Sequence, residues 1–145
     1  MSGIVVGIDG SHNASRALDW AIAEAALRKA DLTVITVHPV PASYWTGQPT
    51  LLPGDETKLA EVRKSADEAV GNAVAAQGDT QPASVTVKAE HGFPATVLID
   101  ASGDSDLLVV GSRGGGGFGA LAMGSVSSQV VHHAKCPVVI VPAGR

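Results

Sequence analysis

The sequence predicts an α/β fold of the Rossmann-like kind, with a five-stranded parallel sheet and helices on both faces. Short apolar runs rich in β-branched residues alternate along the chain with stretches whose apolar residues recur at helical spacing,. That alternation favours parallel strands joined by right-handed crossovers. The length of 145 residues fits a single domain over 1–145, and 45% hydrophobic against 17% charged residues allows a substantial core,.

In the first half of the chain, two continuous apolar runs predict buried strands, because such runs suit a sheet covered on both faces. Two longer stretches have the apolar spacing of helices packed on a sheet, and Asp55 is the expected cap of the second. Four prolines and two glycines without periodicity predict a long loop between them,. The expected elements are a strand over 3–8, a helix over 13–29, a strand over 32–37, a loop over 39–55 and a helix over 56–77.

The second half continues the alternation. A run with every second residue apolar predicts a half-exposed strand, and Pro94 stands at a suitable first position for a short helix,. A fully apolar run then predicts a central strand, followed by a glycine-rich segment, a helix and a last apolar strand. The expected elements are a strand over 84–89, a helix over 94–103, a strand over 106–111, a helix over 125–133 and a strand over 136–141.

Charge is distributed unevenly. All 14 Asp and Glu residues lie between Asp9 and Asp106, whereas residues 107–145 hold three basic residues and no acid. Seven of the 17 glycines lie between Gly111 and Gly124. An acid-free, glycine-dense segment can receive an anion without repulsion. A surface loop with a chance charge bias is the alternative that composition leaves open.

Composition also excludes several classes of protein. A net charge of −4 without a basic run or an aromatic platform argues against nucleic-acid binding,. The single Cys136 excludes an intramolecular disulfide,. No leader pattern begins the chain and no apolar run approaches the ~18 residues that span a membrane. We therefore expect a cytoplasmic protein without a membrane partner.

The glycine-rich segment has the properties of a phosphate site. Glycines let backbone amides approach a ligand closely, and the helix that begins at Ser125 offers free N–H groups to an anion. The lysine of a P-loop is missing. A GxGxxG match at Gly114, Gly116 and Gly119 lacks the acidic residue about 20 positions later that a dinucleotide site needs,. A different kind of phosphate site is therefore predicted.

The glycine spacing resembles the G-2x-G-9x-G-(S/T) signature of ATP-binding universal stress proteins. Residues 5–11, with Asp9 in the turn, are similar to the first strand of that family, and residues 136–141 are similar to its last strand. The resemblance covers essentially the whole chain and implies an adenine nucleotide alpha hydrolase-like sheet of order 3-2-1-4-5. ATP would bind between strands 1 and 4. The spacing that carries the signature is Gly111-x2-Gly114-x9-Gly124-Ser125.

The same resemblance implies a set of nucleotide-binding residues. Asp9 would face the ribose or base, or hold Mg²⁺ together with the phosphates. Pro39 departs from the family, which often has a branched apolar residue there, and it has no N–H for an adenine edge. The implied residues are Gly7, Ile8, Asp9, Pro39, Val110, Gly111, Gly114, Gly124, Ser125, Val126 and Ser127.

The last strand is expected to pair between two copies of the chain. It is apolar along its length yet lies at an edge of the implied sheet, and such edges are normally covered. The resemblance implies a homodimer in which two of these strands meet; coverage by helices and the C-terminal residues is the alternative. The residues concerned are Val138, Val139, Ile140 and Val141.

Three other functions remain open at this point. The first is a stress protein that binds cyclic AMP, the ligand that the resemblance implies for some relatives. The second is a dimeric interaction module that has the same fold and binds no nucleotide. An enzyme is the third possibility, although no obvious general base is present, so we expect a binding protein with at most slow ATP hydrolysis.

Three other patterns in the sequence are weaker. A hydrolase triad of Ser125, His38 and Asp9 lacks the GxSxG turn. A metal site at His132, His133 and Cys136 has poor geometry, since adjacent helical residues point apart. Residues 44–45 suit either a lid over the ligand or a simple packed or mobile loop.

Overall fold

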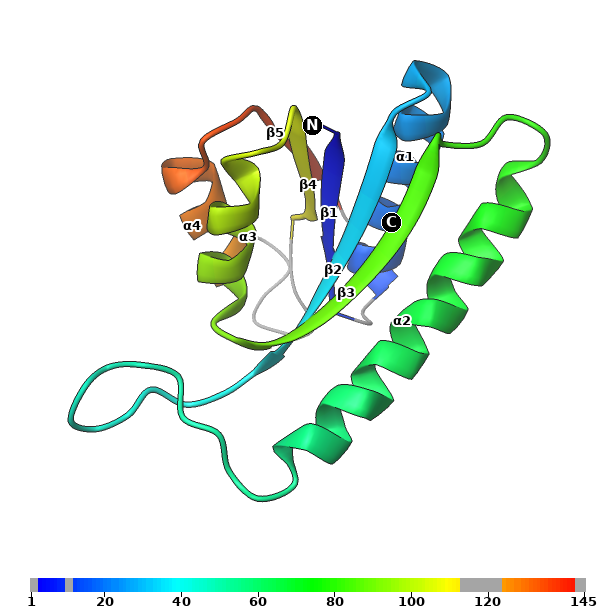
Figure 1. The fold of residues 1–145 in the computed structure, drawn as a ribbon. Coiled ribbons are helices and arrows are strands. Elements are labelled where there is room, and N and C mark those ends of the chain that lie inside the picture. Colours follow the sequence, from blue (N-terminus) through cyan, green and yellow to red (C-terminus); the bar gives the residue numbers. More distant parts are fainter. Residues whose placement is uncertain (1–2, 10–11, 113–123, 143–145) are drawn as a thin grey trace.

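The computed structural model describes residues 3–9, 12–112 and 124–142 and contains nine helices and strands in alternation (Figure 1). In chain order they are β1 (Ile4–Ile8), α1 (His12–Arg28), β2 (Asp31–Pro39), α2 (Asp55–Gln77), β3 (Ser84–Gly92), α3 (Pro94–Ser102), β4 (Leu107–Gly111), α4 (Ser125–His133) and β5 (Val138–Val141).

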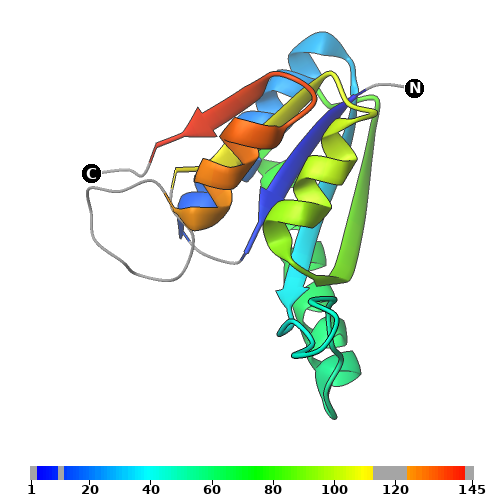
Figure 2. The same ribbon diagram turned by 90° about the vertical axis from the view of Figure 1, so that its left-hand side faces the viewer.

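The five strands form one parallel sheet in the order β3-β2-β1-β4-β5. Helices α1 and α2 cover one face of the sheet, and α3 and α4 cover the other (Figures 1 and 2). The predicted fold class and strand order are therefore confirmed. None of the helices in the described part of the chain is long and apolar enough to cross a membrane.

Each face of the sheet has its own core. Alternate residues of one strand point to opposite faces, so Ile4 and Val6 join the core under α1 and α2, whereas Val5 joins the core under α3 and α4. Leu108 and Val109 of β4 divide between the two cores in the same way, and both are fully buried. The central strands are continuously apolar because both of their faces are covered.

Strands β2 and β3 are longer than predicted. Their ladder continues past the apolar pattern to the pairs His38↔His91 and Pro39↔Gly92. Pro39 is tolerated because it ends the strand and lacks only a backbone N–H donor,. Beyond it, the Val40 N–H donates to the Gly92 carbonyl at 3.3 Å. The polar residues of this extension concealed it from the hydrophobic pattern.

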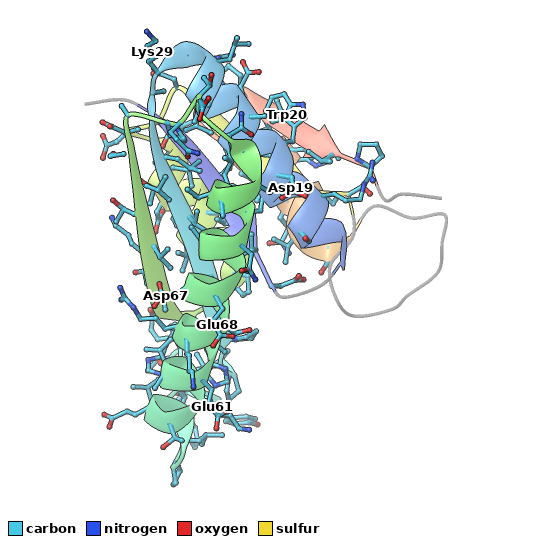
Figure 3. All side chains as sticks on the ribbon, turned by 90° about the vertical axis from the view of Figure 1, so that its right-hand side faces the viewer. Asp19, Trp20, Lys29, Glu61, Asp67 and Glu68 are labelled. Atoms are coloured by element: carbon cyan, nitrogen blue, oxygen red, sulfur yellow. The ribbon has the colours of Figure 1, made fainter. Side chains whose placement is uncertain are left out.

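The long loop is confirmed over 40–54, and it carries its own hydrogen bonds, with Ala42 bridged to Pro49. The prediction that Asp55 caps α2 is wrong. Gly54 occupies the cap position with φ 91°, a left-handed conformation suited to glycine, and Asp55 is the first helical residue,. Figure 1 shows the loop and the first turns of α2 extending beyond the sheet. The exposed surface of α2 carries charged side chains, among them those of Glu61 and Glu68 (Figure 3).

Candidate functional site

The two halves of the sheet separate at the carboxyl ends of β1 and β4. The ladder between these strands runs from Ile4↔Leu107 to Val6↔Val109. Beyond that pair, Gly7 and Ile8 continue to pair with β2, whereas Val110 pairs with β5. This is the point where the strand order reverses, and open α/β sheets bind their ligands there.

The start of α4 is tied to this edge of the sheet by hydrogen bonds. The Ser127 hydroxyl donates to the Gly111 carbonyl at the end of β4. The Gly124 N–H donates to the Ser112 carbonyl at 2.7 Å, and the Ser112 N–H donates to the Val141 carbonyl of β5 at 2.9 Å. The N-terminus of α4 is therefore held at the switch point.

The first turn of α4 is suited to an anion. Gly124 precedes the helix in an extended conformation, and within the described residues no side chain caps the helix. First-turn N–H groups have no acceptor inside a helix and carry the positive end of its dipole. Ser125 is exposed, while Ser127 is 4% exposed and donates its proton to Gly111. Ser125 therefore offers an exposed hydroxyl, and Ser127 positions the helix.

Gly7 allows close contact between β1 and α3. A Cβ added at Gly7 would lie 2.7 Å from Cδ1 and 3.0 Å from Cδ2 of Leu98. Leu98 is 4% exposed and belongs to the core under α3 and α4. The observed contact of Gly7 is thus with the protein itself.

The remaining implied residues lie at the same edge where they are described. Ile8 is half-buried and packs against the core under α1 and α2, Asp9 is exposed just after β1, and the Pro39 ring is exposed at the end of β2. Val126 is half-buried and packs against the opposite core. Gly114 lies outside the described residues.

A polar cluster that the sequence did not predict lies where β2 and β3 end. His38 Nε2 is 2.9 Å from Asp55 Oδ1, and His91 Nε2 is 3.1 Å from the Asp55 carbonyl oxygen. The N–H of Leu52, the hydrogen bond with His38 and the charges of both histidines hold the pKa of Asp55 below its ordinary value, against a smaller opposing effect of burial,. A histidine at the end of each of two neighbouring strands was the available signal.

The alternative sites are not assembled. His38 contacts Asp55 of α2, on the face of the sheet opposite α4. Its imidazole is therefore turned away from Ser125, and the hydrolase triad of Ser125, His38 and Asp9 is not formed. His132 Nδ1 contacts the Ser128 carbonyl in its own helix at 2.7 Å. No group of three or more potential ligands that could hold a metal ion occurs within residues 3–9, 12–112 and 124–142. Residues 44–45 expose 92% and 87% of their surface.

Comparison with known proteins identifies the group to which these features belong. Residues 1–142 match the model of the Universal stress protein family. A universal stress protein of Mycolicibacterium smegmatis is 34% identical over 139 residues, which are 96% of this chain and 47% of that protein. The chain thus spans about half the length of the curated relatives it matches.

Solved structures share the fold over nearly the whole chain. The universal stress protein UspA from Lactobacillus plantarum superposes with a TM-score of 0.76 at 25% identity, covering 97% of each chain. A universal stress protein in complex with cAMP superposes with a TM-score of 0.68 at 24% identity, covering 97% of this chain and 96% of its own.

Proposed function

The chain belongs to the universal stress protein family, and from that premise we propose that it binds ATP at the carboxyl edge between β1 and β4. The observation that carries the proposal is the start of α4, held at this edge through the Ser127–Gly111 hydrogen bond. Members of the fold have been solved in complex with cAMP, dAMP and AMP, which supports an adenine nucleotide as the ligand.

In this proposal each part of the edge has a physical role. The N–H groups of Ser125 and Val126 and the Ser125 hydroxyl receive phosphate oxygens at the positive end of α4. Val110 and Gly111 line the nucleotide from β4. Gly114, through its spacing in the signature, leaves room for the phosphates.

The opposite side of the nucleotide would be bounded by β1 and β2. The Pro39 ring packs against the base and offers no N–H to it. Asp9 contacts the ribose, or holds Mg²⁺ together with the phosphates, as a single carboxylate commonly does. A bound Mg²⁺ would neutralise part of the phosphate charge. Asp9 is exposed at the end of β1, and one carboxylate is enough for this role, because Mg²⁺ can take its other ligands from phosphates and water,.

We infer that the protein acts as a nucleotide-responsive regulator in the cytoplasm and hydrolyses ATP slowly at most. Hydrolysis requires a positioned base and cationic stabilisation of the transferring phosphate. The imidazole of His38 is engaged with Asp55, so it does not supply that base.

The direct test identifies the small molecules that the purified protein releases on denaturation, by mass spectrometry, and then measures ATP and cAMP affinity by calorimetry. We expect an adenine nucleotide to be released and ATP to compete more strongly than cAMP. Gly114→Val should abolish binding. Gly71→Ala is the matched glycine control, since nothing lies within 4 Å of its added Cβ. Absence of any adenine nucleotide binding refutes the proposal.

A homodimer through β5 is a second proposal. In the sheet order β5 is an edge strand of four apolar residues, and an apolar edge favours pairing with a second copy,. Ile140→Lys should convert a dimer to monomers in sedimentation experiments. The control is Thr86→Lys on β3, an exposed position on the other edge strand. A monomeric parent protein would contradict the proposal.

A further inference from the structure

The 40–54 segment, which joins β2 to α2, presents an uncharged apolar surface to solvent. Tyr44 and Trp45 are almost completely exposed, although the chain has only one tyrosine and two tryptophans. Leu51 and Leu52 expose more than half of their surface. The segment contains no Asp, Glu, Lys, Arg or His. Apolar surface gathered in this way is typical of a binding site.

The two aromatic rings of this surface form a right-angled corner. The ring centroids of Tyr44 and Trp45 are 5.2 Å apart, and the ring planes meet at 83°. A flat aromatic ligand that stacks on the indole of Trp45 therefore meets the phenol ring of Tyr44 edge to face. Both arrangements are favourable between aromatic rings. The corner suits one planar aromatic ligand.

The size of this surface also favours a small ligand over a second copy of the chain. Two large aromatic side chains bury about 300–450 Å² between them, and the half-exposed Leu51 and Leu52 are smaller. A stable protein interface buries about 800 Å² on each partner. Tyr44 and Trp45 therefore provide too little area to hold a dimer by themselves.

The 40–54 segment begins beside the proposed nucleotide site. It leaves the sheet at the carboxyl end of β2, and β2 and β4 lie on either side of β1. Figures 1 and 2 show that it extends on the side of the sheet covered by α3 and α4, where the first turn of α4 is the proposed phosphate site. Two strand spacings separate β2 from β4, which is about 10 Å.

The outer part of the segment, residues 41–50, is a unit with a narrow attachment. The Thr50 N–H donates to the Pro41 carbonyl at 2.8 Å and ties the two ends of this unit together. The unit joins the rest of the chain through Val40 on one side and Leu51 on the other. Val40 is buried, whereas Leu51 is exposed. Rotation of the backbone at these two residues moves the unit without altering the sheet.

We propose that the 41–50 unit turns toward the β1–β4 edge and stacks Trp45 on the adenine of the bound nucleotide, with Pro39 against the other face of the base and Tyr44 at its edge. At ~3.3 Å per residue, the chain after Pro39 reaches about 20 Å by Trp45, which exceeds the distance from β2 to β4. None of the residues implied for the site is aromatic. This inference rests on the proposed function, to which it adds a stacking contact for the base.

Tryptophan fluorescence tests the contact directly, because the chain has only Trp20 and Trp45. Trp20→Phe leaves Trp45 as the single reporter, and Trp45→Phe leaves Trp20, which lies on α1. We expect ATP to quench the emission of Trp20→Phe and to leave that of Trp45→Phe unchanged. Inorganic tripolyphosphate, which has no base, should quench neither protein.

Calorimetry measures what the stacking contributes to affinity. Trp45→Ala should weaken ATP binding by about 5- to 100-fold, as alanine substitution of base-stacking aromatic residues does, and should leave tripolyphosphate binding unchanged. Leu51→Ala is the matched control, since it removes another exposed apolar side chain of the same segment. Its ATP affinity should equal that of the parent protein.

The outcomes separate this inference from the proposed function. ATP binding that is detected by calorimetry, with Trp45 emission unquenched and affinity unchanged in Trp45→Ala, overturns the stacking contact and leaves the nucleotide site standing. Equal losses of ATP and tripolyphosphate affinity in Trp45→Ala overturn it as well, because the base is then not what Trp45 recognises. A parent dimer that Trp45→Ala converts to monomers, with ATP affinity unchanged, assigns the surface to a second copy instead. If calorimetry detects no ATP binding to the parent protein, the proposed function fails and the stacking contact fails with it.

Discussion

Gly7→Ala tests whether the glycine at the end of β1 is required by packing or by the ligand. The added methyl would lie 2.7 Å from Cδ1 and 3.0 Å from Cδ2 of Leu98, closer than carbon atoms tolerate without movement. Leu98 is 4% exposed and packs in the core with Val5, Leu108 and Val130, so its side chain has little space in which to move,. Either the Leu98 side chain or α3 as a whole must therefore move.

The magnitude follows from the two opposing effects of the methyl group. Overpacking of a filled core costs about 1–3 kcal/mol. Replacing glycine by alanine also reduces the entropy of the unfolded chain, which returns about 0.4–1 kcal/mol. We therefore expect Gly7→Ala to lower the free energy of unfolding by about 1–2 kcal/mol.

The assay is a double-mutant cycle in urea. Leu98→Ala alone should cost about 2–5 kcal/mol, because it leaves a cavity. In the Leu98→Ala background the methyl at position 7 no longer meets a neighbour and fills part of that cavity. The double variant should therefore be more stable than the sum of the single changes predicts, by about 1–3 kcal/mol. ATP affinity of folded Gly7→Ala then measures any separate role of Gly7 toward the ligand.

Two results would refute this reasoning. A neutral or stabilising Gly7→Ala would mean that Leu98 rotates away at no cost. Strict additivity of Gly7→Ala and Leu98→Ala would mean that the destabilisation arises elsewhere than in their contact.

Three further changes address other contacts. Ser127→Ala should lower the free energy of unfolding in urea by about 1–3 kcal/mol, since it removes a buried hydrogen bond to β4, while the exposed Ser125→Ala should change it by less than about 0.5 kcal/mol,; equal effects would contradict this. Ser102→Ala should cost a similar ~1–3 kcal/mol in thermal melts, because the fully buried hydroxyl accepts the Lys135 N–H at 2.9 Å,. The pKa of Asp55 lies below its ordinary value of 3.8, so its carboxylate stabilises the fold above that pH and the contribution disappears as pH falls through the folded pKa,. The stability difference between the parent and Asp55→Asn should therefore shrink below pH 4, and a constant difference would contradict the assignment.

The strands and helices could be predicted because their signals are local, whereas the sheet order was implied by the resemblance to the family. Continuous apolar runs such as residues 107–111 are typical of strands buried on both faces, and the helical spacing of residues 56–77 repeats over many turns,. The extension of β2 and β3 could not be predicted in this way. It depends on pairing between His38 and His91, whose polar side chains interrupt the apolar pattern at a strand end.

The contact between His38 and Asp55 was missed for a related reason. An acidic residue at a helix start ordinarily accepts N–H groups of the first turn, so the local pattern predicts a cap. Here Asp55 instead accepts the preceding Leu52 N–H and contacts His38, seventeen positions earlier. Such a contact depends on where the 40–54 segment ends in space, which composition and periodicity do not contain.

The glycine signature shows the opposite case, in which spacing has a structural cause. The carbonyl of its first residue, Gly111, accepts a hydrogen bond from the Ser127 hydroxyl. Near its end, the Gly124 N–H donates to the Ser112 carbonyl. Both ends of the intervening segment are therefore fixed against each other at the switch point. Because the anchors are hydrogen bonds at the end of β4, they form only when β4 and α4 are packed together, so the proposed phosphate binding at this edge would depend on the complete fold.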